Sequence, residues 1–186
     1  MIFLGLGSNL ASKYGDRFTN INLAISFLEG YGIKVIKKSS FYETPSYPNK
    51  KNPKFINIVI LIETILSPVD LMSVLIFIEK KLGRKRNKKN DPRTCDIDII
   101  DFNGQIMSLM YNNLKLTLPH KELTTRNFIL FPLHEISPKW KHPKTKEIIS
   151  DLVQKLSEDD KNSILKIEKN WYNNKMINQE DLINKV

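Results

Sequence analysis

The sequence contains little cysteine, little glycine and no long hydrophobic run. Cys95 is the single cysteine among 186 residues, so no disulfide can form within the chain and we expect a reducing compartment. The most apolar stretch, residues 55–66, is interrupted by Asn57 and Glu63 and is shorter than the roughly 20 apolar residues of a membrane-spanning helix. No basic segment precedes an apolar one at the N-terminus, which argues against a signal peptide. These absences predict a soluble, cytoplasmic protein.

Familiar nucleotide and zinc motifs are also missing. Gly5 and Gly7 lack a third glycine at the spacing of a dinucleotide-binding loop, and no Gly-Lys-Ser/Thr follows Gly83 as a phosphate-binding loop would require. Cysteine and histidine do not stand at zinc-ligand spacing. Cys95 is predicted to face the core and has no evident histidine partner, so a thiol nucleophile is not expected.

The charge balance is basic, with 29 Lys and Arg against 20 Asp and Glu, a formal net charge of +9. Such a charge favours anionic partners, which include nucleic acid, a membrane surface and phosphorylated small ligands. A solvated surface rich in lysine is the plainer alternative. The length and the hydrophobic fraction of 41% fit one globular domain.

Apolar patterning predicts an α+β fold. Strands are expected at residues 2–7, 33–42, 55–64 and 94–102, with helices at 17–29 and after the N-cap Ser67. The order strand, helix, strand, strand, helix, strand is that of a ferredoxin-like fold with a largely antiparallel sheet. In the C-terminal half, the expected elements are a hairpin at Asn103-Gly104 with residues 105–109 returning, a helix from Thr124 or Thr125 to Leu133, another at 148–156, and a helix or loose tail at 162–186.

Two carboxylates dominate the candidate chemistry. Asp96 and Asp98 lie two positions apart in a predicted strand, so both point to one face, about 6–7 Å apart at Cα. They could bind one Mg²⁺ or bridge two, or they could be neutralised by Lys and Arg. Three arginines nearby, Arg84, Arg86 and Arg93, suit phosphate oxygens, although a solvated loop or an RNA-binding patch would also explain them. Glu79 lies on the apolar face of its predicted helix. We expect it either to form an ion pair with a nearby arginine or to lie at the edge of a functional site.

Several segments resemble one enzyme family when they are read in order. They are Gly7-Ser8-Asn9-Leu10, Ser40-Phe41-Tyr42 with Thr44-Pro45, Phe55-Ile56-Asn57, Ile78-Glu79 with Leu82-Gly83-Arg84, residues 92–99 (PRTCDIDI), and Leu118-Pro119-His120 with Arg126-Asn127-Phe128. This series is similar to 6-hydroxymethyl-7,8-dihydropterin pyrophosphokinase over residues 2–156. The resemblance implies a three-layer α-β-α sandwich, with a pyrophosphokinase domain at 1–156 and a C-terminal extension at 157–186.

The resemblance also implies a reaction, in which pyrophosphate passes from ATP to 6-hydroxymethyl-7,8-dihydropterin and AMP is released in folate biosynthesis. The implied catalytic residues are Arg84, Arg86, Arg93, Asp96 and Asp98, with two Mg²⁺ held by the two aspartates. The implied pterin-binding residues are Thr44, Pro45, Phe55, Asn57 and Phe128. The implied ATP-binding residues are Glu79, Arg84, Arg93, Ile99, Lys115, Thr117, His120 and Arg126. Nucleic-acid and membrane partners are not expected, and the enzyme is expected to be a monomer.

Three departures from the family pattern stand out. Residues 87–91 lack the Trp-Gly that often precedes Pro-Arg-Thr, Lys115 replaces a common arginine, and Lys121 replaces an aromatic residue of some members. Two loops, residues 44–54 and 83–93, are rich in proline or charge, and we expect them to close over bound substrates. The rival hypothesis is a non-enzymatic nucleic-acid-binding module. Against it, the acid pair would repel nucleic-acid phosphates, and exposed aromatic residues in an RNA-binding pattern are not evident.

Overall fold

The computed structural model describes residues 1–85, 90–111 and 114–168. In chain order the elements are β1 (Ile2–Ser8), α1 (Arg17–Gly30), β2 (Lys34–Lys38), β3 (Phe41–Thr44), β4 (Phe55–Glu63), α2 (Pro68–Lys81), β5 (Asp96–Phe102), β6 (Met107–Tyr111), β7 (Leu114–Leu118), a 3-10 turn (Leu123–Thr125), α3 (Asn127–Ile136), α4 (Ile149–Gln154), α5 (Glu158–Asn162) and β8 (Leu165–Ile167).

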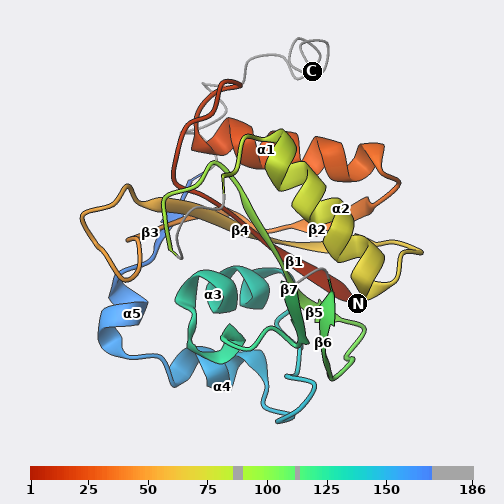
Figure 1. Ribbon diagram of the computed structural model, residues 1–186. Helices are drawn as coiled ribbons and strands as arrows, with labels where there is room; N and C mark the ends of the chain where they lie inside the picture. The colour runs from red at the N-terminus through yellow and green to blue at the C-terminus, as the bar shows by residue number, and fades with distance from the viewer. Residues whose placement is uncertain (86–89, 112–113, 169–186) are drawn as a thin grey trace.

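A six-stranded antiparallel sheet organises the chain. The strand order is β5-β1-β4-β3-β8, with β2 also pairing with β4, so β1 and β4 lie at the centre. Helices α1 and α2 cover one face, and α3 and α4 cover the other (Figure 1). This arrangement confirms the predicted ferredoxin-like α-β-α sandwich.

Each face of the sheet carries its own apolar core. Leu4 and Leu6 of β1 pack with residues of α1 and α2, whereas Phe3 packs with α3 and α4. The helices begin where short polar residues satisfy free backbone N–H groups. Asp16 accepts hydrogen bonds from the N–H of Phe18 and Thr19 at α1, and Ser67 accepts from Asp70 at α2, the N-cap expected from the sequence.

The expected hairpin after β5 is wrong. Asn103 and Gly104 do form a turn, with φ of 53° and 70°. The strand that follows does not return along β5, however, because Met107–Tyr111 pairs with Leu114–Leu118 in a separate two-stranded ribbon. The sequence analysis missed β7, whose alternating leucines offer β6 apolar partners in register. Leu109 faces Leu116, and Met107 faces Leu118.

Other boundaries also differ from expectation. Residues 33–42 form two strands, because the break at Ser39 lets that residue exchange backbone and side-chain hydrogen bonds with Val59. Helix α3 begins at Asn127 after a 3-10 turn and continues to Ile136. Within 162–186, expected to be a helix or tail, Leu165–Ile167 joins the sheet beside β3, while residues 169–186 lie outside the described part. The boundary at residue 156 stays a prediction.

In the part of the chain that the structure describes, no helix has both the length and the apolar character required to cross a membrane.

Candidate active site

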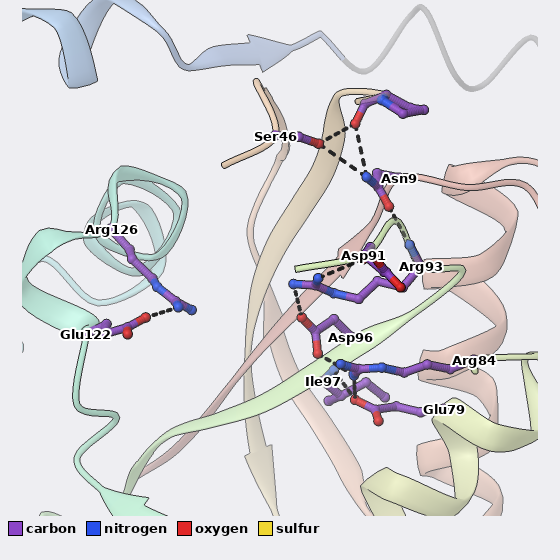
Figure 2. Close-up of polar contacts among 11 residues, drawn as sticks. Asn9, Ser46, Glu79, Arg84, Asp91, Arg93, Asp96, Ile97, Glu122 and Arg126 are labelled. Carbon is purple, nitrogen blue, oxygen red and sulfur yellow. Dashed lines mark hydrogen bonds and ion pairs between the residues drawn. The ribbon is translucent and has the colours of Figure 1, made fainter. Parts of the chain in front are cut away.

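The two aspartates begin β5 and lie in different surroundings. Asp96 forms ion pairs with Arg84 and Arg93, the latter through Arg93 Nη2 at 2.6 Å from Asp96 Oδ2. Figure 2 shows the Asp96 carboxylate held between the two guanidinium groups. In the described residues, no hydrogen bond or ion pair is formed by the Asp98 side chain. Three of the expected residues, Arg84, Arg93 and Asp96, therefore meet at one place.

Burial and charge separate the two aspartates electrostatically. Burial alone would raise the pKa of Asp96, but Arg93 and Arg84 outweigh it and hold the pKa below its usual value. Burial, followed by the negative charge of Asp96, raises the pKa of Asp98 to about 7. Arg126 and Arg84 offset this increase only in part, whereas Asp96 forms ion pairs with two arginines.

Glu79 joins this cluster from α2. Its side chain is buried, pairs with Arg84, and accepts a hydrogen bond of 2.8 Å from the backbone N–H of Ile97. The expectation that Glu79 pairs with a nearby arginine is confirmed. Because Arg84 contacts both Glu79 and Asp96, Glu79 fixes the arginine and the start of β5 together (Figure 2).

A second group of expected residues gathers around β4. Asn57 donates a hydrogen bond of 3.0 Å from its amide to the hydroxyl of Thr44 on neighbouring β3. A Cβ at Gly7 would approach Asn57 Oδ1 to 3.0 Å and the Phe55 ring to 3.5 Å, so glycine leaves these side chains their room. Thr44, Phe55 and Asn57 are therefore close neighbours, with Pro45 following Thr44 directly in the chain.

Both aromatic residues expected at the pterin have an arginine over the ring. The guanidinium carbon of Arg93 lies 4.9 Å from the Phe55 centroid, and that of Arg126 lies 5.3 Å from the Phe128 centroid. Arg126 also pairs with Glu122 and points toward the Arg93 and Asp96 side of the close-up (Figure 2). Each arginine can thus reach an aromatic face and an anionic group.

The remaining residues expected at the nucleotide are spread over β5, β7 and the segment after β7. Burial, followed by the positive charge of Arg126, lowers the pKa of His120 to about 4. Thr117 is half-buried and lies 3.3 Å from Ser108 between their hydroxyls, while Lys115 is exposed. The Ile99 side chain lies in the apolar core with Ile97. The ligand roles of all these residues stay predictions, and Arg86 lies outside the described residues.

Asn9 is a central residue of the site to which the sequence analysis gave no role. Its buried amide nitrogen donates to Ser46 Oγ (3.2 Å) and Pro53 O (3.1 Å), and its amide oxygen accepts from the Arg93 N–H (2.7 Å). Asn9 therefore joins the loop after β1 to both loops that are expected to close (Figure 2). The sequence shows only an asparagine between a predicted strand and a predicted helix. Its hydrogen-bond partners are distant in the chain, so the sequence alone does not reveal them.

The carboxylates suit a hard divalent cation that is shared with a ligand. Among residues 1–85, 90–111 and 114–168, no group of three or more His, Cys, Asp or Glu side chains could hold a metal ion alone. Asp96 and Asp98 supply oxygen ligands, which Mg²⁺ prefers, and Mg²⁺ usually completes its coordination with water and substrate phosphates. The raised pKa of Asp98 fits a carboxylate whose charge a bound cation would compensate.

Comparison with known proteins decides the family. The sequence model of the 7,8-dihydro-6-hydroxymethylpterin-pyrophosphokinase (HPPK) family matches residues 3–138. The chain belongs to this family. The match includes every residue that the sequence analysis placed in the site, from Thr44 to Phe128.

The chain is similar both to proteins of about its own length and to parts of much longer ones. The chain is 36% identical over 137 residues to the 2-amino-4-hydroxy-6-hydroxymethyldihydropteridine pyrophosphokinase of Methylorubrum extorquens, covering 73% of this chain and 82% of that protein. It is 36% identical over 155 residues to the folic acid synthesis protein fol1 of Schizosaccharomyces pombe, covering 83% of this chain. It spans only about a fifth of the fungal proteins' length, 20% for this fol1 and 22% for that of Pneumocystis carinii.

Solved structures support the HPPK fold. The wild-type Plasmodium falciparum HPPK-DHPS crystal structure matches with a TM-score of 0.66 and 18% identity, covering 83% of this chain and 44% of that one. At this identity the similarity concerns the fold.

Proposed function

We propose that this protein transfers the pyrophosphoryl group of ATP to the hydroxymethyl group of 6-hydroxymethyl-7,8-dihydropterin, giving AMP and the pterin diphosphate in folate biosynthesis. Membership of the HPPK family is the observation that carries the proposal. The site supports it, because Asp96, Asp98, Arg84 and Arg93 provide the charges that a polyphosphate reaction needs.

The chain's own residues would act mainly by positioning and by charge. The pterin hydroxyl would attack the β-phosphorus of ATP in line, and AMP would leave. Arg84 and Arg93, which now pair with Asp96, have planar donor groups suited to the phosphate oxygens. Asn57 would donate or accept hydrogen bonds at the pterin edge, and Phe55 and Phe128 would stack on its faces once the arginines over them turn to the phosphates.

Asp96 and Asp98 would hold two Mg²⁺ together with ATP. When bound, these ions would neutralise phosphate charge and lower the pKa of the attacking hydroxyl. A monomeric enzyme in the cytoplasm, without nucleic-acid or membrane partners, remains our expectation.

A product assay tests the proposal directly. Purified protein, ATP, Mg²⁺ and 6-hydroxymethyl-7,8-dihydropterin are mixed, and nucleotides are followed by ³¹P NMR. We expect AMP and a pterin diphosphate only when pterin and Mg²⁺ are both present. ADP with phosphate would show a different bond cleavage, and the absence of any turnover would contradict the activity.

A further inference from the structure

The described segment at the C-terminal end, residues 158–167, lies beyond the range that the family model matches. It contains α5 and β8, and it passes along the side of the sheet formed by β3 (Figure 1). Both neighbours of this segment, α3 and β3, carry residues of the candidate site. The contacts of residues 158–167 with α3 and β3 can therefore affect the positions of these site residues.

The first contact is made at the start of α3. Asn127 lies between Arg126 and Phe128 in the chain, and only 8% of its surface is exposed. Its amide nitrogen donates to the backbone oxygen of Asp160 at 2.6 Å and to Ser163 Oγ at 3.0 Å. The last carbonyl groups of a helix lack hydrogen-bond partners within the helix. Asn127 donates a hydrogen bond to one of these groups, the Asp160 carbonyl near the end of α5. A helix of five residues has little stability of its own, so α5 depends on such contacts.

The second contact is made at the other end of α3. β8 pairs antiparallel with β3, where Lys166 is opposite Tyr42 and Leu165 is opposite Glu43. The Glu135 carboxylate of α3 accepts from the Tyr42 hydroxyl at 2.9 Å and pairs with Lys166 Nζ at 3.1 Å. It also accepts from the Ser40 N–H and hydroxyl, at 3.1 and 2.8 Å. Residues 158–167 are thus fixed to α3 near both of its ends and to β3 along one edge.

These contacts connect two walls of the candidate pterin site. Helix α3 carries Phe128, and β3 ends in Thr44, which accepts the hydrogen bond of Asn57. We propose that residues 158–167 form a brace that fixes α3 relative to β3, and that Asn127 is the positioning residue through which the brace places Phe128 at the pterin. This inference rests on the proposed function for its ligand. Asn127 itself is not assigned a contact with either substrate.

The test uses the full chain with Asn127→Ala, which removes both hydrogen bonds of the amide. Ser163→Ala is a milder variant, because it removes the hydrogen bond from Asn127 to Ser163 Oγ but leaves the one to the Asp160 carbonyl in place. Leu23→Ala is the control, because it opens a cavity in the opposite helical layer without touching the brace. For each variant, KM and kcat for the pterin are measured, together with urea unfolding and backbone hydrogen exchange in the absence of ligand.

In Asn127→Ala, a displaced Phe128 should raise the KM for the pterin about five- to twentyfold and change kcat by less than about threefold, because stacking contributes alike to ground and transition states. Ser163→Ala should show a smaller increase, and Leu23→Ala an unchanged KM despite lower stability. Exchange should accelerate in the first turn of α3 and in β8.

Two results would overturn the brace. One is an unchanged KM in Asn127→Ala alongside normal turnover by the native chain, and the other is unchanged exchange in α3 and β8. Absence of AMP formation by the native chain would overturn the proposed function instead. The link to the pterin would then fail with it, while the exchange data would still decide whether Asn127 holds the brace to α3.

Discussion

At the scale of single residues, two aspartates two positions apart lie in different electrostatic surroundings. Asp96 is already balanced by two arginines, whereas burial and the charge of Asp96 raise the pKa of Asp98 to about 7. The oxygen of Asp98 is therefore the one that gains most from a cation. Asp96 would have to share its charge between arginines and metal, which fits a site that assembles only when phosphate draws the arginines away.

Asp98→Ala should reduce turnover by about a hundredfold or more, because the proposed Mg²⁺ would lose a direct ligand. The rate of AMP formation at saturating ATP, pterin and Mg²⁺ measures the effect, and circular dichroism checks the fold. Asp70→Asn, at the exposed start of α2, is the matched control and should retain the native rate. Near-native turnover of Asp98→Ala would refute the metal assignment.

His120 gives a prediction for the pH dependence of stability. Its pKa is about 4 in the folded chain and about 6.5 when the side chain is free, because burial and Arg126 disfavour the proton. The unfolded state therefore binds this proton more readily, so the contribution of His120 to the free energy of unfolding should rise as pH increases from 4 to 6.5, while the raised pKa of Asp98 contributes a decrease over the same range. His120→Gln loses the rising contribution, so urea unfolding should show a free energy of unfolding that rises less, or falls more, across this range than in the native chain. Identical pH profiles for the two proteins would contradict the lowered pKa of His120.

At the scale of elements, the sequence predicts what local patterns determine. The β-branched residues of β4 and the Ser67 N-cap of α2 are signals contained within a few consecutive residues. The order of the first elements, and with it the fold class of the chain, could therefore be predicted. The partner of β6 and the pairing of β8 depend on contacts far apart in the chain, and these were missed. The same limit applies to the site. The aspartates were found by their alternation, whereas Asn9 and Asn127 act through distant partners.

Asn9 predicts how the two loops beside the site are linked. Its side chain contacts Ser46, Pro53 and Arg93, so Asn9→Ala should loosen both loops at once. Hydrogen exchange should accelerate in residues 45–54 and 90–93 of the free protein, and the added protection expected on binding an ATP analogue with pterin should diminish. Asn103→Gly, in a turn with positive φ away from these loops, is the control. Acceleration confined to one loop would show that the loops move independently.

At the scale of the whole molecule, one sheet joins two cores. Phe3 and Leu4 are adjacent in β1 but belong to the cores on opposite faces. The backbone hydrogen bonds of β1 to β4 and β5 support both helical layers. If the sheet came apart, both apolar cores would therefore be exposed to water. The proposed active-site residues come from both sides of this sheet, since Glu79 lies on α2 and Phe128 on α3. A partly unfolded chain would therefore lose one side of the candidate site, and we expect it to lose the proposed activity.

We therefore expect one cooperative unfolding transition. Leu28→Ala in the α1 layer and Leu133→Ala in the α3 layer should each lower the free energy of unfolding by about 2–5 kcal/mol, the usual cost of a buried cavity. In a Trp171→Phe background, Trp140 fluorescence reports the α3 side, and far-ultraviolet circular dichroism reports the whole chain. Both signals should move to the same lower urea midpoint in each variant. If Leu28→Ala shifted the dichroism and left Trp140 fluorescence unchanged, the layers would unfold separately, because the sheet would then persist with only one core intact.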